Sequence, residues 1–86
     1  MLLEYDKFTI HNIKDIHKSI VDDFNFSSHI AIDFQNIDEI DLSGLQLLVS
    51  LKQSCESKGK TFQLKNIKDE IIYAFEISGI SEVLEV

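Results

Sequence analysis

The sequence predicts an α/β fold, with a mixed sheet of about four to five strands and helices mostly on one face. Residues 30–34 alternate between apolar and small or polar side chains, which is the period of a strand. Residues 45–55 then place apolar side chains at helical spacing, and residues 61–65 alternate again. Strands that alternate with helices indicate parallel pairing through helical crossovers.

Length and composition predict one small domain over residues 1–86. A chain of 86 residues buries only about 60–65% of its unfolded surface, so one core is expected. The composition is 44% hydrophobic and 27% charged, which is typical of a globular chain rather than a disordered one.

The first third of the chain predicts short strands and one amphipathic helix. Apolar side chains alternate from Leu2 to Ile10, which indicates two short strands or a hairpin. Asn12 is expected to cap a helix, because its side chain can accept an unpaired first-turn N–H. The apolar stripe of that helix is Ile13, Ile16, Ile20 and Phe24.

The centre of the chain predicts a strand, a loop and a capped apolar helix. The alternation of residues 30–34 ends at polar residues, so Gln35–Ile40 is expected to be a loop. Asp33 is expected to be a surface or loop-bonding carboxylate. A Ser or Asp in the stretch Asp41–Gly44 is expected to cap the helix that follows.

The last third predicts a strand, a third helix and a tail. The helix before it is expected to end at Lys58–Lys60, and Thr61–Lys65 is predicted to be a strand with one face exposed to water. Asn66 is expected to cap the third helix, and Gly79 is expected to end it. Ile80–Val86 is interpreted as a short tail that docks as a last edge strand.

Charge and targeting signals narrow the function classes. The net charge of −7 disfavours nucleic acid and anionic membrane surfaces, which both require clustered basic residues. The single cysteine, Cys55, excludes a disulfide framework and is expected to be a buried thiol. The sequence carries no signal peptide pattern and no apolar run of about 18 residues. It is therefore interpreted as cytoplasmic, without membrane insertion.

The sequence resembles a known family most clearly at Ile40–Leu48, which reads IDLSGLQLL. This stretch is similar to the signature of STAS domains, the anti-sigma factor antagonist family, in which an Asp-x-Ser-Gly-Leu turn opens a helix. Phe8–Asn12 resembles the second strand of that family and the start of its first helix. Phe75–Ile80 resembles the close of its third helix. The resemblance implies a STAS fold over nearly the whole chain.

The resemblance also implies a switch in bacterial signalling. In anti-sigma factor antagonists, a partner serine kinase that also holds a sigma factor phosphorylates the serine before the glycine. By this resemblance Ser43 would be the phosphorylation site, with Asp41, Leu42 and Gly44 beside it in the partner-binding surface. The unphosphorylated form would bind the kinase, or anti-sigma factor, and so regulate transcription.

The partner surface is expected to extend to a second loop. Thr9, His11 and Asn12 are interpreted as part of an exposed loop and sheet edge near Ser43, because strand ends and helix starts converge in such folds.

Two alternatives stay open at this point. Leu42 stands where many STAS members carry a small polar residue, and some members use that position for their functional hydroxyl. The chain could therefore be a non-phosphorylated regulatory or scaffold subunit of a lipid-transport ATPase or a chemotaxis assembly. Acyl carrier proteins also present a serine after an aspartate, but they are all-helical, and Leu42 separates Asp41 from Ser43 here.

The sequence contains no recognisable pattern of catalytic residues, so the chain is predicted to be a non-enzymatic protein without a cofactor. It has no glycine-rich phosphate loop, no nucleophile elbow and no defensible acid–base pair. Asp38, Glu39 and Asp41 form an acidic cluster, which is interpreted as solvated rather than metal-binding. The three histidines also lack metal-ligand spacing.

Overall fold

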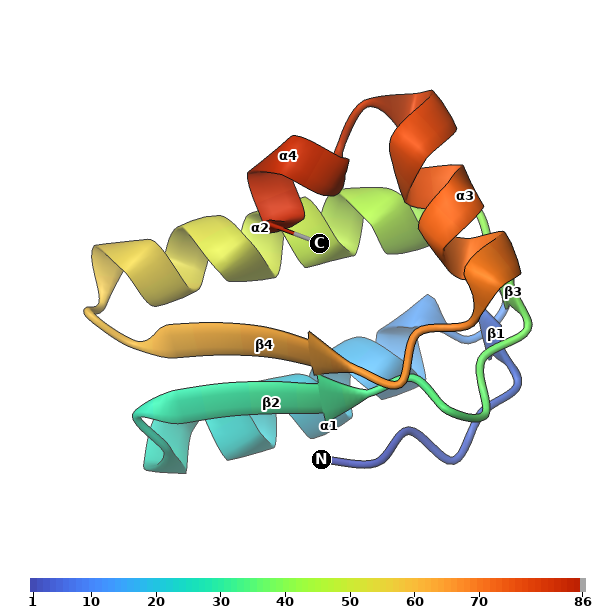
Figure 1. The fold of residues 1–86 in the computed structure, drawn as a ribbon. Helices are drawn as coiled ribbons and strands as arrows, with labels where there is room; N and C mark the ends of the chain where they lie inside the picture. Colours follow the sequence, from blue (N-terminus) through green and yellow to red (C-terminus); the bar gives the residue numbers. More distant parts are fainter. Residues whose placement is uncertain (86) are drawn as a thin grey trace.

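A computed structural model describes residues 1–85 of the chain. Its helices and strands alternate along most of the sequence (Figure 1). In chain order they are β1 (Lys7–Phe8), α1 (Ile13–Phe26), β2 (His29–Asp33), β3 (Glu39–Ile40), α2 (Leu42–Ser57), β4 (Thr61–Lys65), α3 (Asp69–Ser78) and α4 (Ser81–Leu84). The predicted α/β class is confirmed.

The strands of the described chain pair in two parallel two-stranded sheets. β2 pairs with β4 over five residues, from His29 opposite Thr61 to Asp33 opposite Lys65. β1 pairs with β3 over two residues. The two pairs are separate because the chain turns directly after β2, where the Ile37 N–H donates to the Phe34 carbonyl at 2.9 Å.

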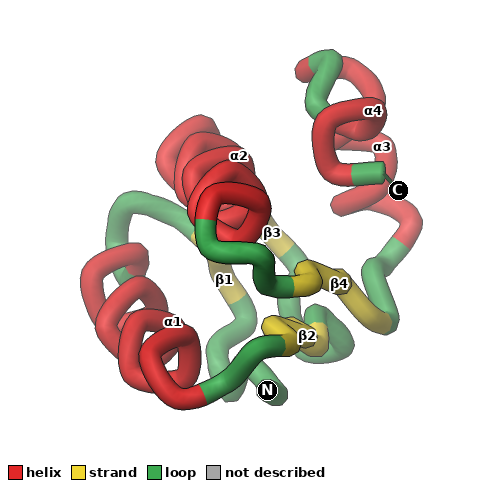
Figure 2. Tube along the Cα trace, turned by 90° about the vertical axis from the view of Figure 1, so that its left-hand side faces the viewer, coloured by secondary structure: helices red, strands yellow, loops and turns green. Residues whose placement is uncertain are grey.

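The β2–β4 pair has one covered face and one open face. α1 and α2 lie side by side against the covered face (Figure 2). Ile30 and Ile32 of β2 point into that face and are buried. On β4, alternate residues remain exposed, so the predicted strand with one face in water is confirmed.

The core lies between the strands and the helices. Its apolar members, each almost fully buried, are Leu3, Phe8, Ile16, Ile20, Ile30, Ile32, Phe34, Ile37, Leu48, Leu51, Cys55, Ile71, Phe75 and Leu84. The Phe8 and Phe34 rings join the two sheets, with ring centroids 5.3 Å apart. Cys55 is the buried thiol that its helical register predicts, and desolvation raises its pKa.

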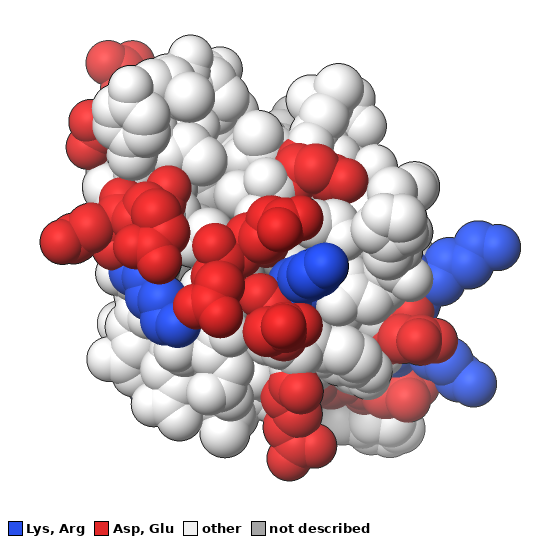
Figure 3. Space-filling model, turned by 90° about the vertical axis from the view of Figure 1, so that its right-hand side faces the viewer, with Lys and Arg blue, Asp and Glu red and all other residues white. Residues whose placement is uncertain are grey.

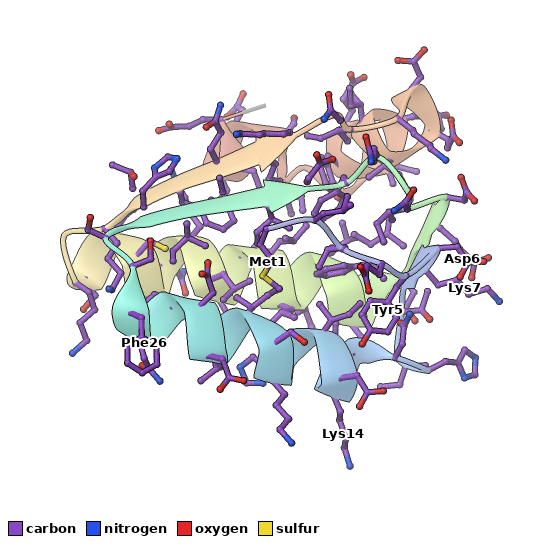
Figure 4. All side chains as sticks on the ribbon, turned by 90° about the horizontal axis from the view of Figure 1, so that it is seen from below. Met1, Tyr5, Asp6, Lys7, Lys14 and Phe26 are labelled. Atoms are coloured by element: carbon purple, nitrogen blue, oxygen red, sulfur yellow. The ribbon has the colours of Figure 1, made fainter. Side chains whose placement is uncertain are left out.

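Of the two alternatives predicted for the amino-terminal segment, two short strands or a hairpin, the hairpin does not form. Leu2 instead makes an isolated parallel bridge to Asp33 at the end of β2, and β1 pairs with β3. The Asp33 N–H donates to the Met1 carbonyl at 2.8 Å, which explains why this segment runs beside β2. In the view of Figure 4, Met1 lies near the middle of the face that is shown, whereas Asp6 and Lys7 lie toward one end, where Lys7 pairs with Glu39 of β3.

Two further expectations are corrected. The predicted loop Gln35–Ile40 ends in a strand, because Glu39 and Ile40 pair with β1. The carboxy-terminal tail forms the short helix α4 rather than an edge strand, with the Leu84 N–H donating to the Ile80 carbonyl at 2.9 Å. Val86 lies outside the described residues.

Asn66 does not cap the third helix. It adopts a positive φ of 54°, and α3 begins after Lys68 instead. The Asn66 amide donates to the Asp33 carboxylate at 3.1 Å, and the Gln35 N–H donates to the same carboxylate at 2.9 Å. Asp33 is therefore the loop-bonding carboxylate that its position predicts. Gly79 ends α3 as predicted, in the left-handed conformation that glycine favours.

Candidate functional site

The start of α2 is held by Asp41, which is the N-cap residue. One carboxylate oxygen accepts a hydrogen bond from the Gly44 N–H at 3.2 Å. The sequence offered either a Ser or an Asp for this role, and the structure assigns it to Asp41. Ser43 lies inside the first turn of the helix, and its half-buried side chain is not the one that provides the cap.

Asp41 also joins two loops that are distant in the sequence. Its second carboxylate oxygen accepts from the Ile10 N–H at 3.0 Å, and its own N–H donates to the Phe8 carbonyl at 3.4 Å. The β1–α1 loop is therefore fastened to the start of α2 by one side chain. This contact brings the two loops together, as the convergence of strand ends and helix starts predicts.

The hydrogen bonds around Asp41 stabilise its charged form. The Ile10 N–H contributes most to lowering the pKa of this carboxyl below its usual value, and the Gly44 and Ser43 N–H groups and His11 add to the effect. Partial desolvation acts in the opposite direction, but it does not overcome the hydrogen bonds. The carboxylate is therefore fixed in position and negatively charged at neutral pH.

Gly44 allows α2 to lie directly against β1 and β3. A Cβ atom added to Gly44 would lie 2.2 Å from the Phe8 carbonyl oxygen and 2.8 Å from a side-chain carbon of Ile40. Both distances are shorter than real Cβ contacts, and the first involves backbone that cannot swing away. Only glycine fits between the helix and the two strands, so Gly44 sets the depth at which Ser43 lies.

The β1–α1 loop presents a different surface from the one expected. Thr9 is only 2% exposed and is not a surface residue, because its hydroxyl and backbone bond within its own loop. Asn12 is half-buried, and its amide group donates to the Lys7 carbonyl and accepts from the Thr9 N–H. His11 is exposed, as expected.

Exposed apolar side chains lie on both sides of Asp41. Leu42 is 66% exposed, and Ile10, whose N–H donates to Asp41, is 62% exposed. Sequence reasoning missed Ile10, because its alternation with Phe8 reads as a core position. Burial of such side chains against another molecule is favourable, so Leu42 and Ile10 suit contact with a partner.

Comparison with protein families agrees with this character. The sequence profile of the STAS domain matches residues 6–86 of the chain. The chain belongs to the STAS domain family. STAS domains are protein-interaction and regulatory modules, and they are generally non-enzymatic. A search of curated proteins finds no match.

The end of this STAS domain around the α2 start is strongly acidic. Figure 3 shows carboxylates gathered on that end of the molecule, with few basic side chains among them. The exposed acidic residues contributed by β3, the start of α3 and the loops beside them are Asp6, Asp38, Glu39, Asp69 and Glu70. Lys68 is paired with Asp38, so its charge is already partly neutralised.

The acidic end of the STAS domain is not arranged as a metal centre. Within residues 1–85, no group of three His, Cys, Asp or Glu side chains converges as metal ligands would. Asp38 and Asp41 instead bond to Lys68 and to backbone N–H groups. Among the same residues, no helix combines the length and apolarity needed to cross a membrane.

Proposed function

We propose that this STAS domain is a phosphorylation-switched interaction module of the anti-sigma factor antagonist type. In this proposal the unphosphorylated form binds a partner that is both a serine kinase and an anti-sigma factor. The kinase activity of the partner modifies Ser43, and the modified form is released.

The position of Ser43 carries this proposal. The serine lies in the first turn of α2 within the Asp-x-Ser-Gly-Leu turn, between the exposed Leu42 and the wedged Gly44. Because Asp41 supplies the helix cap, the Ser43 hydroxyl has no capping role that modification would remove. Phosphorylation at this position would therefore leave the fold of the site largely intact.

In this proposal, the negative charge of a phosphate on Ser43 is what releases the partner. A phosphate adds a charge of about −1.5 to −2 and three acceptor oxygens. A helix start can hold such an anion, because its free N–H groups point outward. The chain contains no arginine, and Asp38, Glu39 and Asp41 already make this end negative. A partner that approaches this end with carboxylates or a bound nucleotide of its own would be repelled.

One observation favours a second function, that of a scaffold without phosphorylation. Leu42 is largely exposed at the centre of the site, and an apolar side chain there gains stability whenever a partner covers it. This gain does not depend on the state of Ser43. A constitutive subunit of a transport or chemotaxis assembly would use the same surface.

Mass spectrometry on the protein from its native source tests the proposal first. We expect a partial gain of one phosphate, mapped to the peptide Leu42–Lys52, that varies with growth conditions. A pull-down with purified Ser43→Ala should recover the partner more completely than the wild type does, while Ser43→Asp should recover less. Ser19→Asp, an exposed helical serine on α1, is the matched control for added charge.

The outcomes separate the two functions. If Ser43→Asp lowers recovery of the partner and Ser19→Asp does not, the electrostatic switch is supported. If Ser43→Asp and Ser19→Asp both recover the same partner as the wild type, but Leu42→Ser does not, the chain acts as a scaffold. The phosphorylation switch is then contradicted.

A further inference from the structure

The outward face of α2 is free of charge over most of its length. The helix has two charged residues, Lys52 and Glu56, and they are paired at 3.8 Å. The Lys52 side chain is only 12% exposed and reaches Glu85 beyond α4, at 3.5 Å. The outward residues of α2 are otherwise uncharged: Leu42, Gln46, Ser50, Gln53, Ser54 and Ser57.

The uncharged outward residues of α2 form a ridge, and hollows flank this uncharged ridge on both sides. Toward α4 lies a hollow of about 270 Å³, whose apolar lining includes Leu45, Val49 and Ile80. Toward α1 lie two more hollows, of about 310 and 160 Å³, which are both lined in part by Phe24. Ser50 borders the hollows on both sides, so it lies at the crest of the ridge.

Other parts of the described surface carry more charge than α2 does. α1, although shorter than α2, carries Lys14, Asp15, Lys18, Asp22 and Asp23. α3 is acidic, and the end of the molecule near β3 gathers carboxylates (Figure 3). Two copies of a chain with a net charge of −7 repel each other over most orientations. An approach through the α2 ridge adds little to this repulsion, because the only charged residues of α2 are the paired Lys52 and Glu56.

The size of this face suits a dimer. α2 has 16 residues, so it is about 24 Å long and spans most of one side of a molecule that measures 30 × 25 × 20 Å. A stable interface buries about 800 Å² on each partner. This is roughly one sixth of the 5209 Å² surface, or about one side of the molecule.

We propose that the chain forms a twofold symmetric dimer through the uncharged ridge of α2 and the hollows beside it. A ridge next to a hollow is self-complementary, because a twofold axis places the ridge of each copy against the hollow of the other. Interface cores are likewise depleted in charge. Ser50 is near the middle of α2, so an antiparallel crossing of the two helices brings Ser50 close to its twin in the second copy.

Sedimentation equilibrium of the full chain over a range of concentrations tests the dimer. The wild type should reach twice the chain mass of 9.9 kDa as concentration rises. Ser50→Glu should weaken the association by about tenfold or more, because it places two like charges near the axis. Ser19→Glu, at an exposed helical serine on α1, should leave the association unchanged.

Charge rescue tests the symmetry itself. Ser50→Glu and Ser50→Lys should each associate more weakly alone than the wild type does, but a mixture of the two should form a heterodimer more readily than either variant forms a homodimer. Raising the salt concentration from about 0.01 M to about 0.1 M should preserve or strengthen the wild-type dimer, because salt screens the repulsion between acidic copies.

A monomer at every concentration would overturn the proposal, and the ridge would then be left for another protein. A dimer that Ser50→Glu leaves intact would place the interface elsewhere and would also overturn it. None of these outcomes depends on the state of Ser43, so the dimer and the phosphorylation switch can fail separately.

Discussion

The starts of α1 and α2 carry the same kind of residue but are built differently. Asn12 stands at the N-cap position of α1, and Asp41 stands at that of α2. Asp41 accepts a first-turn N–H from its own helix and a second N–H from a loop 31 residues away. The Asn12 side chain makes no capping bond and bonds only within its own loop.

This difference shows what fixes the position of the candidate site. The α2 start is tied to the β1–α1 loop by Asp41 and to the β1 and β3 strands by Gly44. At the α1 start, the hydrogen bonds of the Asn12 side chain stay within the β1–α1 loop. A surface that must present Ser43 and Leu42 in one arrangement gains from such long-range ties, because local bonds alone allow a helix end to fray.

The largest expected effect tests the close packing of Gly44 against β1 and β3. Gly44→Ala should lower the free energy of unfolding by about 3 kcal/mol, because the added Cβ overlaps the Phe8 carbonyl and the core cannot shift freely. Urea denaturation measures this loss. Gly59→Ala is the matched control, because its Cβ meets open space and only its positive φ is strained. A loss at Gly44 no larger than that at Gly59 would contradict this close packing.

The next effect compares the two helix starts directly. Asp41→Ala removes a helix cap and a charge-assisted bond to the Ile10 N–H, so we expect a loss of about 2 kcal/mol. Asn12→Ala removes bonds within one loop, and we expect a loss of about 1 kcal/mol. Denaturation of both variants gives the difference. Equal losses would mean that the link between the loops adds nothing.

The two helix starts also show how far the sequence predicts this structure. Local patterns predicted the apolar stripe of α1, the strands β2 and β4, the end of α3 at Gly79, and the α/β class. They failed where a distant partner decides the structure. β3 forms because residues 7–8 lie beside it, and Asn66 bonds to Asp33 instead of capping α3.

The sequence likewise predicts one part of the candidate site and misses another. The turn at residues 41–44 is recognisable from its own residues, because a cap, a serine and a glycine precede an apolar helix. The burial of Thr9, the exposure of Ile10 and the hollow between α2 and Ile80 depend on contacts between separate segments. Neither alternation nor helical spacing reports such contacts.

The pH dependence of stability tests the charge of Asp41. The folded-state pKa of this carboxyl is below its unfolded value of 3.8, so its contribution is present above that value and is lost as the pH falls through the folded-state pKa. The stability difference between the wild type and Asp41→Asn should therefore be constant above about pH 5 and shrink below about pH 4. Denaturation at several pH values measures it. A difference that persists unchanged in acid would mean that the charge of Asp41 is not involved.

The smallest expected effect is that of Ser43→Ala. A capping serine would lose about 0.5–2 kcal/mol on this change. The structure gives the cap to Asp41, and alanine favours helix more than serine does, so stability should stay within about 0.5 kcal/mol of the wild type. Denaturation of Ser43→Ala beside Asp41→Ala checks this ranking. A loss of about 1 kcal/mol or more at Ser43 would show that its hydroxyl supports the helix start. A near-neutral result would mean that the Ser43 hydroxyl does not support the helix start, which leaves it free for contact with a partner or for modification.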